Sequence, residues 1–243
     1  MARVLLINPN SSAHMTDAMA AAVRPVLAQG SSLLALTAAY GPQSIEGYYD
    51  EVFAIPPMLE ALREHEGQFD GVVIGCFDDT GVDAARCVTR APVVGICQAG
   101  MQAAASLASS FSVITTLGRS VPALEHLAVK YGYERACKRI RASEVPVLEL
   151  ENTEGDAARK VRDQVRAALE EDHAEAIVLG CAGMTTFARR LEEDFGVPVI
   201  DGVGVAAKWV EALSTLGYRT STANGYAPPR PKNYAGLFER YTP

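Results

Sequence analysis

The sequence predicts an α/β protein with two pseudo-symmetric lobes, each a parallel sheet flanked by helices, and a cleft between them. The strongest observation is an internal repeat. Gly-Val-Val-Ile-Gly-Cys at 71–76 precedes Pro-Val-Val-Gly-Ile at 92–96, and Ala-Ile-Val-Leu-Gly-Cys at 176–181 precedes Pro-Val-Ile-Asp-Gly at 198–202. Each copy has a β-branched strand ending in Gly-Cys, a helical stretch, and a second buried strand that begins at proline. A duplicated half-domain explains both copies.

The second observation is a regular alternation of apolar strands and amphipathic helices along the first half. We expect strands at 3–7, 33–37, up to 76, and at 93–96, and helices at 13–27, 50–64 and 82–88. The turn at 8–12 contains Ser11 and Ser12, either of which can cap the first helix. Strands that alternate with helices form parallel sheets covered on both faces.

The second half repeats this order. We expect strands at 112–116, near Val147, at 176–181 and at 197–201, and helices at 99–109, 121–131, 155–171, 185–195 and 203–216. The shared period places the crossing into the second lobe near Ile96 and the return near Gly202. The predicted lobes are therefore 1–97 plus 203–243, and 98–202, with the C-terminal tail packed on the first lobe.

Composition and charge argue against a nucleic-acid-binding or membrane protein. The chain has 243 residues and a net charge of −7, so no overall basic surface is available for nucleic acid or an anionic membrane. The N-terminal apolar run is too short for a signal peptide, and no segment has the length of a membrane span. We expect a cytoplasmic protein that acts on a small molecule.

The cysteine pattern argues against disulfides and metal. There are five cysteines, an odd number, without a Cys-x-x-Cys pair and with only four histidines. We expect free thiols and no metal. Cys87, Cys97 and Cys137 are interpreted as small apolar residues. The segment at 202–205 resembles a dinucleotide loop but lacks its third glycine, so no cofactor is expected.

The candidate site lies where parallel strands end. Ligands bind at the carboxyl ends of such strands, and the turn at 8–12, Cys76, Thr115, Thr116 and Cys181 all fall there. A pseudo-twofold axis would place Cys76 and Cys181 on opposite walls of the cleft. One thiolate and one thiol on either side of a carbon atom supply the base and the acid that inversion of a stereocentre requires, without pyridoxal phosphate or metal. Each cysteine precedes a predicted helix, where the dipole would favour a thiolate.

Several segments together resemble the hydantoin racemase branch of the aspartate/glutamate racemase superfamily, which includes allantoin racemases. These are Ile-Asn-Pro-Asn-Ser-Ser at 7–12, Ser-Ile-Glu-Gly at 44–47, Gly-Cys-Phe-Asp-Asp at 75–79, Val-Ile-Thr-Thr at 113–116, Leu-Gly-Cys-Ala-Gly-Met at 179–184 and the segment at 198–202. One departure is Thr80, where relatives commonly have proline. The resemblance implies a homo-oligomeric racemase, with the last helices as the expected contact.

The resemblance also indicates a substrate class. Amino-acid racemases of the superfamily carry Gly-Cys-Thr-His or Cys-Asn-Thr at their cysteines, whereas this chain has Phe77-Asp78 and Ala182-Gly183. A neutral ring, a 5-substituted hydantoin or allantoin, is therefore expected in place of free aspartate or glutamate.

We assign the binding roles on this basis. Backbone N–H groups of Phe77, Ala182 and Gly183 would receive the oxygen that gains charge, and Phe77 would form an apolar wall. The Thr115 and Thr116 hydroxyls, the Asn10 amide, and Ser44 with Ile45 would orient the ring.

Other interpretations stay open. Asn10 could serve only the turn, and Thr115 with Thr116 could be ordinary strand residues. Asp78 and Asp79 could be general bases, although acidic residues at a helix start more often complement its dipole. An amino-acid racemase, a decarboxylase or a cis–trans isomerase of the superfamily is the enzymatic alternative. A two-lobed ligand-binding protein without catalysis is the alternative of another class.

Overall fold

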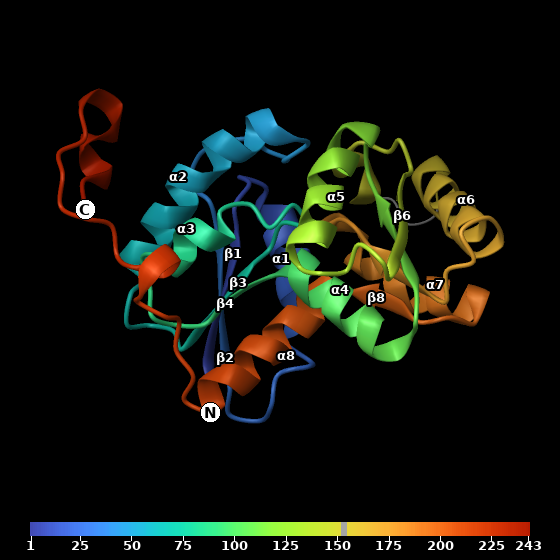
Figure 1. The fold of residues 1–243 in the computed structure, drawn as a ribbon, viewed down its shortest axis with the longest axis horizontal. Coiled ribbons are helices and arrows are strands. Elements are labelled where there is room, and N and C mark those ends of the chain that lie inside the picture. The colour runs from blue at the N-terminus through green and yellow to red at the C-terminus, as the bar shows by residue number, and fades with distance from the viewer. Residues whose placement is uncertain (152–154) are drawn as a thin grey trace.

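The computed structural model describes residues 1–151 and 155–243 as two lobes that lie side by side (Figure 1). Each lobe contains a four-stranded sheet in which all neighbouring strands are parallel. The strand orders are β2-β1-β3-β4 and β6-β5-β7-β8, so the same order occurs twice. The predicted two-lobed α/β fold is therefore confirmed.

The first sheet and its helices come from the first part of the chain. Its elements are β1 (Arg3–Asn8), α1 (Ala13–Val23), β2 (Ser32–Thr37), α2 (Tyr48–Glu64), β3 (Gly71–Ile74), α3 (Val82–Arg86) and β4 (Val93–Gly95). The helix predicted at 13–27 ends at Val23, because Pro25 cannot continue it.

The second sheet follows the same plan. Its elements are α4 (Ile96–Leu107), β5 (Phe111–Thr115), η1 (Gly118–Ser120), α5 (Val121–Lys130), β6 (Cys137–Ala142), η2 (Val147–Glu151), α6 (Asp156–Glu170), β7 (Ala176–Leu179), η3 (Ala182–Phe187), α7 (Ala188–Phe195), β8 (Val199–Asp201) and α8 (Gly202–Thr215). The short 3₁₀ helices η4 (Asn224–Tyr226) and η5 (Gly236–Tyr241) lie in the tail.

The strand predicted near Val147 is wrong. Val147 begins η2, and the strand in this position of the repeat is β6, ten residues earlier at Cys137–Ala142. β6 is an edge strand with the sequence Cys-Lys-Arg-Ile-Arg-Ala, of which only Ile140 is buried. Arg141 is held there by Asp172 through two hydrogen bonds of 2.6 Å. A polar edge strand lacks the apolar run on which the prediction depended.

Helices α4 and α8 join the two lobes. α4 begins directly after β4 and packs on β7 and β8, whereas α8 begins directly after β8 and packs on β1, β3 and β4. The two helices also pack on each other. A Cβ atom at Gly202 would lie 2.1 Å from the backbone oxygen of Ile96, so only glycine allows this crossing. The chain thus passes from one sheet to the other through α4, near Ile96, and comes back through α8, near Gly202. The lobe boundaries 1–97 plus 203–243 and 98–202 stay a prediction.

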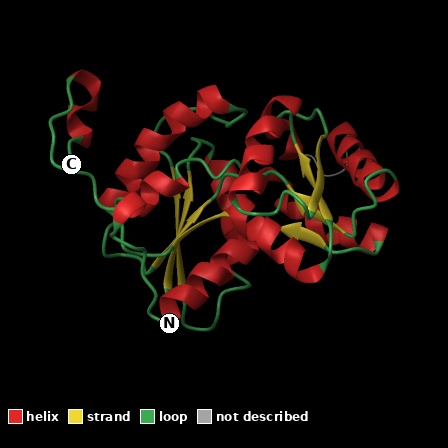
Figure 2. Ribbon diagram, viewed as in Figure 1, coloured by secondary structure: helices red, strands yellow, loops and turns green. Residues whose placement is uncertain are grey.

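The strands lie inside, and helices cover both faces of each sheet (Figure 2). One apolar core runs through both lobes, because buried residues of β1 and β3 join those of β5 and β7 through α4 and α8. Two smaller clusters fill the outer faces beneath α2 and α3, and beneath α6 and α7. The shared core fixes the orientation of the two sets of strand ends.

The tail after α8 returns to the first lobe. Thr220 donates to the backbone oxygens of Arg90 and Ala91 at 2.8 and 2.6 Å, and the Tyr226 hydroxyl contacts Asp83 at 3.0 Å. Within the described residues, no helix combines the length and apolar character that a membrane crossing needs.

Candidate active site

A cavity lies between the lobes at the carboxyl ends of β1, β3, β5 and β7. Its lining residues are Asn10, Met15, Ile45, Gly75, Cys76, Phe77, Asp78, Thr115, Thr116, Ser120, Val147, Gly180, Cys181 and Ala182. Cys76 follows β3 and Cys181 follows β7, which occupy the same position in the two sheets. The structure therefore brings both repeated Gly-Cys segments to one cavity.

The Gly-Cys repeat has a structural cause. Gly75 donates its backbone N–H to Ile7 at 2.8 Å, and Gly180 donates in the same way to Ile114 at 2.7 Å. A Cβ atom would lie 2.7 Å from the Met19 sulfur at Gly75, and 3.0 Å from the Ile114 oxygen at Gly180. Each glycine lets the chain turn tightly past the central strand, and this turn directs the following cysteine to the cavity.

Most of the predicted site residues line this cavity. They are Cys76, Cys181, Asn10, Ile45, Phe77, Thr115, Thr116 and Ala182. Ser44 and Gly183 do not line it. The buried side chain of Ile45 takes the place beside the cavity, and Gly183 lies behind Cys181 with its N–H directed to the cysteine sulfur at 3.4 Å.

Six lining residues were not predicted as site residues: Met15, Gly75, Asp78, Ser120, Val147 and Gly180. Val147 reaches the cavity because its N–H donates to the Glu46 carboxylate at 3.0 Å, across the two lobes. Met15 lies in the first turn of α1, beside the turn at 8–12. Asp78 follows a predicted catalytic cysteine by two positions; the sequence offers it only as an alternative general base, with a helix-dipole role preferred.

The turn after β1 fixes the orientation of Asn10. Its side-chain oxygen accepts hydrogen bonds from Asn8 Nδ2 at 2.8 Å and from Ser12 N at 2.9 Å. Its Nδ2 group donates to the Met15 sulfur at 3.5 Å, the one contact it makes with a described residue. Ser12 caps α1 by accepting from Met15 N at 3.3 Å. The turn thus uses the oxygen of Asn10 and leaves its amide hydrogens for the cavity.

Two donors contact the sulfur of Cys76. The Thr80 hydroxyl lies 3.3 Å from Sγ, and the backbone N–H of Asp78 also donates to it. On the opposite wall, Cys181 caps η3 and accepts from the N–H of Gly183. Both cysteines are half-buried. Each sulfur therefore has donors that would stabilise a thiolate.

The predicted lowering of the thiol pKa values is wrong. Burial raises the pKa of Cys76 well above its ordinary value, and the charge of Asp78 raises it further. Burial likewise raises the pKa of Cys181 to about 12, despite the Gly183 hydrogen bond. Desolvation outweighs the donors at both sulfurs, so the resting form of each residue is the thiol.

The two acidic residues after Cys76 have different surroundings. Asp79 is buried and accepts from Cys97 N and Gln98 N at 3.0 Å and from the Tyr131 hydroxyl at 2.6 Å. It therefore caps α4 and plays a structural part. Burial raises the pKa of Asp78 to about 7, with smaller contributions from Glu51 and Asp79. Asp78 lines the cavity, and its Oδ2 atom has no hydrogen-bond partner.

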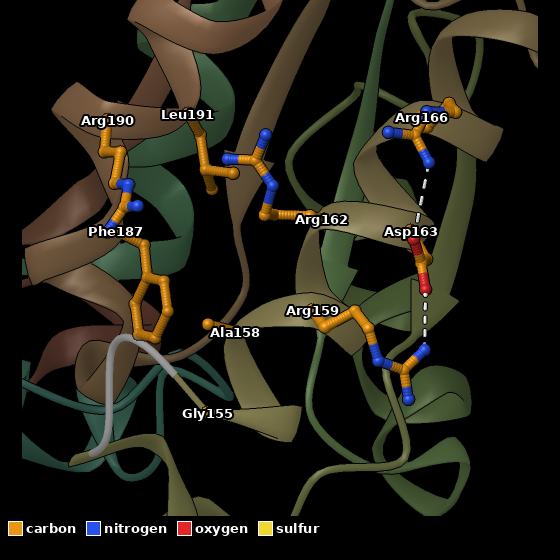
Figure 3. A pocket seen from close by; sticks show the side chains of 9 residues that line it. All are labelled: Gly155, Ala158, Arg159, Arg162, Asp163, Arg166, Phe187, Arg190 and Leu191. Atoms are coloured by element: carbon orange, nitrogen blue, oxygen red, sulfur yellow. Dashed lines mark hydrogen bonds and ion pairs between the residues drawn. The ribbon is translucent and has the colours of Figure 1, made fainter.

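A larger hollow lies elsewhere, between α6 and α7 (Figure 3). Asp163 pairs with Arg159 and Arg166 there, at 3.2 and 3.4 Å, and Arg162 pairs with Asp194. None of the predicted site residues lines it. Among the residues that the structure describes, no group of three or more His, Cys, Asp or Glu is placed to hold a metal ion.

The fold and the site define a class: a two-lobed α/β enzyme with one cysteine from each lobe at the interlobe cavity. The sequence profile of the Asp/Glu/hydantoin racemase family matches residues 4–210. The chain belongs to this family and is an isomerase of the racemase type.

Similar proteins agree with this assignment. The chain is 49% identical to the hydantoin racemase of Rhizobium meliloti, over 95% of this chain and 96% of that one. It is 40% identical to the hydantoin racemase of Pseudomonas sp. (strain NS671), over 98% and 96%. The structure of allantoin racemase from Klebsiella pneumoniae superimposes with a TM-score of 0.95, 43% identity and full coverage of both chains.

A more distant structure shows how far the fold extends. Glutamate racemase from Francisella tularensis gives a TM-score of 0.63 at 13% identity, over 93% of this chain and 85% of that one. At this identity the likeness concerns the fold alone.

Proposed function

We propose that this protein is a cofactor-independent racemase that inverts the C5 stereocentre of 5-substituted hydantoins or allantoin, with Cys76 and Cys181 as paired acid and base. The observation that carries the proposal is the placement of both thiols, from equivalent strands, at one cavity. The similarity to hydantoin racemases and to an allantoin racemase supports the substrate class.

The proposed reaction needs only the two sulfurs. One cysteine, as thiolate, removes the C5 proton, and the other, as thiol, delivers a proton to the opposite face of the planar intermediate. The C5–H bond of a hydantoin adjoins both a carbonyl group and a ring nitrogen, so it is far more acidic than the Cα–H bond of a free amino acid. The two residues exchange roles when the opposite enantiomer reacts.

The cavity offers donors for the oxygen that gains charge. The amide hydrogens of Asn10 face it, and backbone N–H groups of Phe77 and Ala182 follow the two cysteines. The Thr115 hydroxyl donates to the Gly180 oxygen at 3.2 Å, so its lone pairs are left to accept from a ring N–H. Thr116 and Ile45 complete the polar and apolar contacts around the ring.

The charge of the lining supports a neutral ring. None of the described residues that line the cavity is Lys, Arg or His, and Asp78 adds a carboxyl group. Free aspartate or glutamate carries two carboxylates, and their burial is costly unless cations or several hydrogen-bond donors replace the lost water. A hydantoin or allantoin ring avoids this cost.

We also propose that the protein acts in the cytoplasm as a homo-oligomer. Apolar side chains are exposed at the start of α2, at Tyr48, Tyr49, Val52 and Phe53, and after α8, at Leu216 and Tyr218. Exposed apolar groups of this kind occur at subunit contacts. Light scattering after size-exclusion chromatography tests the assembly, and a purely monomeric species would contradict it.

The test of the proposed function is polarimetry on single enantiomers of 5-benzylhydantoin, 5-methylhydantoin, allantoin, aspartate and glutamate, with enzyme-free controls for spontaneous racemisation. We expect enzyme-dependent loss of rotation with a hydantoin or allantoin. Loss of rotation with an amino acid alone would support the amino-acid racemase alternative. Binding without any loss of rotation or exchange of the carbon-bound proton would support a ligand-binding protein.

A further inference from the structure

Asp78 has a buried carboxyl oxygen without a partner. Among the described residues, Asp78 Oδ2 and Glu51 Oε1 are the two buried side-chain oxygen or nitrogen atoms that make no hydrogen bond. Of these two residues only Asp78 lines the cavity between the thiols. An unsatisfied buried acceptor is costly in a folded protein and often marks a place where a ligand supplies the donor.

Asp78 lies close to the place where the reacting carbon would bind. Its backbone N–H donates to the sulfur of Cys76, and Asp78 lines the same cavity with a buried carboxyl oxygen that has no partner. A carboxyl group held two residues from the thiol that exchanges the C5 proton lies within reach of the atoms bonded to C5. In a hydantoin, one of these atoms is a ring nitrogen that carries a hydrogen.

We propose that Asp78 is a specificity-determining residue, whose free carboxylate oxygen accepts a hydrogen bond from the ring N–H beside the reacting carbon. This inference rests on the proposed function and deepens it.

Other acceptors in the cavity are weaker or already used. The Asn10 oxygen accepts from Asn8 and Ser12. The Thr115 hydroxyl remains a neutral acceptor. Asp78 is the one carboxyl group among the described lining residues, and hydrogen bonds to an ionised acceptor are the stronger ones.

The titration of the neighbouring groups fits this assignment. The thiols lose their protons only well above neutral pH, whereas the pKa of Asp78 is about 7. Asp78 is therefore a carboxylate under conditions in which a thiolate forms. It accepts a hydrogen bond in the reactive state and does not donate one.

The experiment compares two rings in two proteins. A 5-substituted oxazolidine-2,4-dione has an oxygen atom in place of the N–H group beside C5 and otherwise the shape of the hydantoin. The ratio of kcat/KM for the hydantoin to that for this analogue is measured in the wild type and in Asp78→Ala. We expect the ratio to fall roughly tenfold to 100-fold in the variant, because one charge-assisted hydrogen bond is lost. Both rings carry a methyl group on N3 in this comparison, because the N3–H of an oxazolidinedione would otherwise ionise near neutral pH and respond to the charge of Asp78. The intrinsic acidities of the two C5–H bonds cancel in the ratio.

Matched variants and a second analogue sharpen the result. Glu51→Gln removes a neighbouring carboxylate that does not line the cavity, and its ratio should equal that of the wild type. Asp78→Asn keeps the side-chain shape and should show a smaller fall if Asp78→Ala does not fold. A 3-methylhydantoin keeps the N–H beside C5, so its kcat/KM relative to the parent should be the same in wild type and variant.

An equal hydantoin-to-oxazolidinedione ratio in the wild type and both Asp78 variants would overturn the assignment. A change only in the ratio of 3-methylhydantoin to its unmethylated parent would also overturn it, because Asp78 would then contact the other nitrogen. If the wild type racemises neither ring, the proposed function itself fails, and that outcome is distinct from an equal ratio.

Discussion

The two walls of the cavity are built from equivalent segments, 76–80 and 181–185, and differ in what each places beside its thiol. Cys76 has the Thr80 hydroxyl at 3.3 Å and the acidic side chain of Asp78 nearby. Among the described residues, Cys181 has only the Gly183 N–H at 3.4 Å, and Gly183 occupies the position that matches Asp78. The internal repeat explains why each wall carries a thiol. The sequence differences between its two copies explain why the groups beside Cys76 and Cys181 differ.

The largest expected effect comes from removing either thiol. Cys76→Ser and Cys181→Ser should each lower kcat/KM for racemisation by roughly 100- to 10,000-fold, because a serine hydroxyl is a much weaker acid and base. Polarimetry on a single hydantoin enantiomer measures the loss. Cys87→Ser is the matched control, since Cys87 is also half-buried but is the C-cap residue of α3 and does not line the cavity. Equal activity in Cys181→Ser and Cys87→Ser would exclude a two-thiol reaction.

A second comparison concerns the acidic caps of the helices that join the lobes. Asp79→Ala removes two hydrogen bonds at the start of α4 and one from the Tyr131 hydroxyl, and should lower the free energy of unfolding by about 2 kcal/mol. Asp201→Ala removes the cap of α8, where Val203 and Gly204 donate, and should cost about 1 kcal/mol. Urea unfolding measures both. A larger loss in Asp201→Ala would show that the buried Asp79 carboxylate is poorly compensated.

The asymmetry of the walls also predicts a pH effect. The carboxylate of Asp78 raises the pKa of both thiols, and Glu51, Asp79, Cys76 and Cys181 are the titratable groups that influence or face it. Asp78→Asn removes this negative charge, so the thiol pKa values fall. The rising limb of kcat/KM against pH should therefore move to lower pH, by about one pH unit.

The matching substitution Glu51→Gln separates this effect from a general loss of charge. Glu51 raises the pKa of Asp78 and is not among the groups that shift the pKa of Cys76 or Cys181. We expect a smaller movement of the limb in this variant. A shift to higher pH in Asp78→Asn would contradict the electrostatic assignment.

The smallest expected effect distinguishes Thr80 from Thr185. Thr80 donates to Cys76 Sγ, whereas Thr185 donates to the Ala182 oxygen and to Asp201. Thr80→Val should lower kcat/KM about threefold to tenfold, the value of one hydrogen bond to a developing thiolate. Both directions should fall equally, because enantiomers have the same free energy. A Thr80→Val enzyme with wild-type rates would show that this contact has no part in catalysis.

Much of this arrangement could be predicted from the sequence because local signals and the repeat agree. The apolar runs before Cys76 and Cys181 are buried on both faces, and their duplication indicated equivalent strands and a shared cavity. The polar edge strand β6 could not be predicted in this way, because its only buried side chain is Ile140. This strand was therefore placed near Val147 by mistake. The sequence also did not predict that Val147 lines the cavity.

Some of the site residues could likewise be predicted from the sequence, and others could not. Side chains at strand ends, such as Thr115 and Thr116, follow from the topology of a parallel sheet. In the loop before α2, Ile45 lines the cavity whereas Ser44 does not. The sequence of the loop alone does not distinguish these two positions. The sign of the thiol pKa shift was missed for a physical reason: the expected helix dipole is a local feature, whereas the burial that outweighs it depends on both lobes.

The most direct test of the two-thiol reaction is the deuterium content of substrate and product after a short reaction in D₂O. One enantiomer of a 5-substituted hydantoin is supplied, and the exchange without enzyme is subtracted. Two bases on opposite faces predict deuterium at C5 in nearly all of the inverted product and almost none in the remaining substrate. Equal deuterium in both, or protium retained in the product, would indicate a single base and contradict the pairing of Cys76 with Cys181.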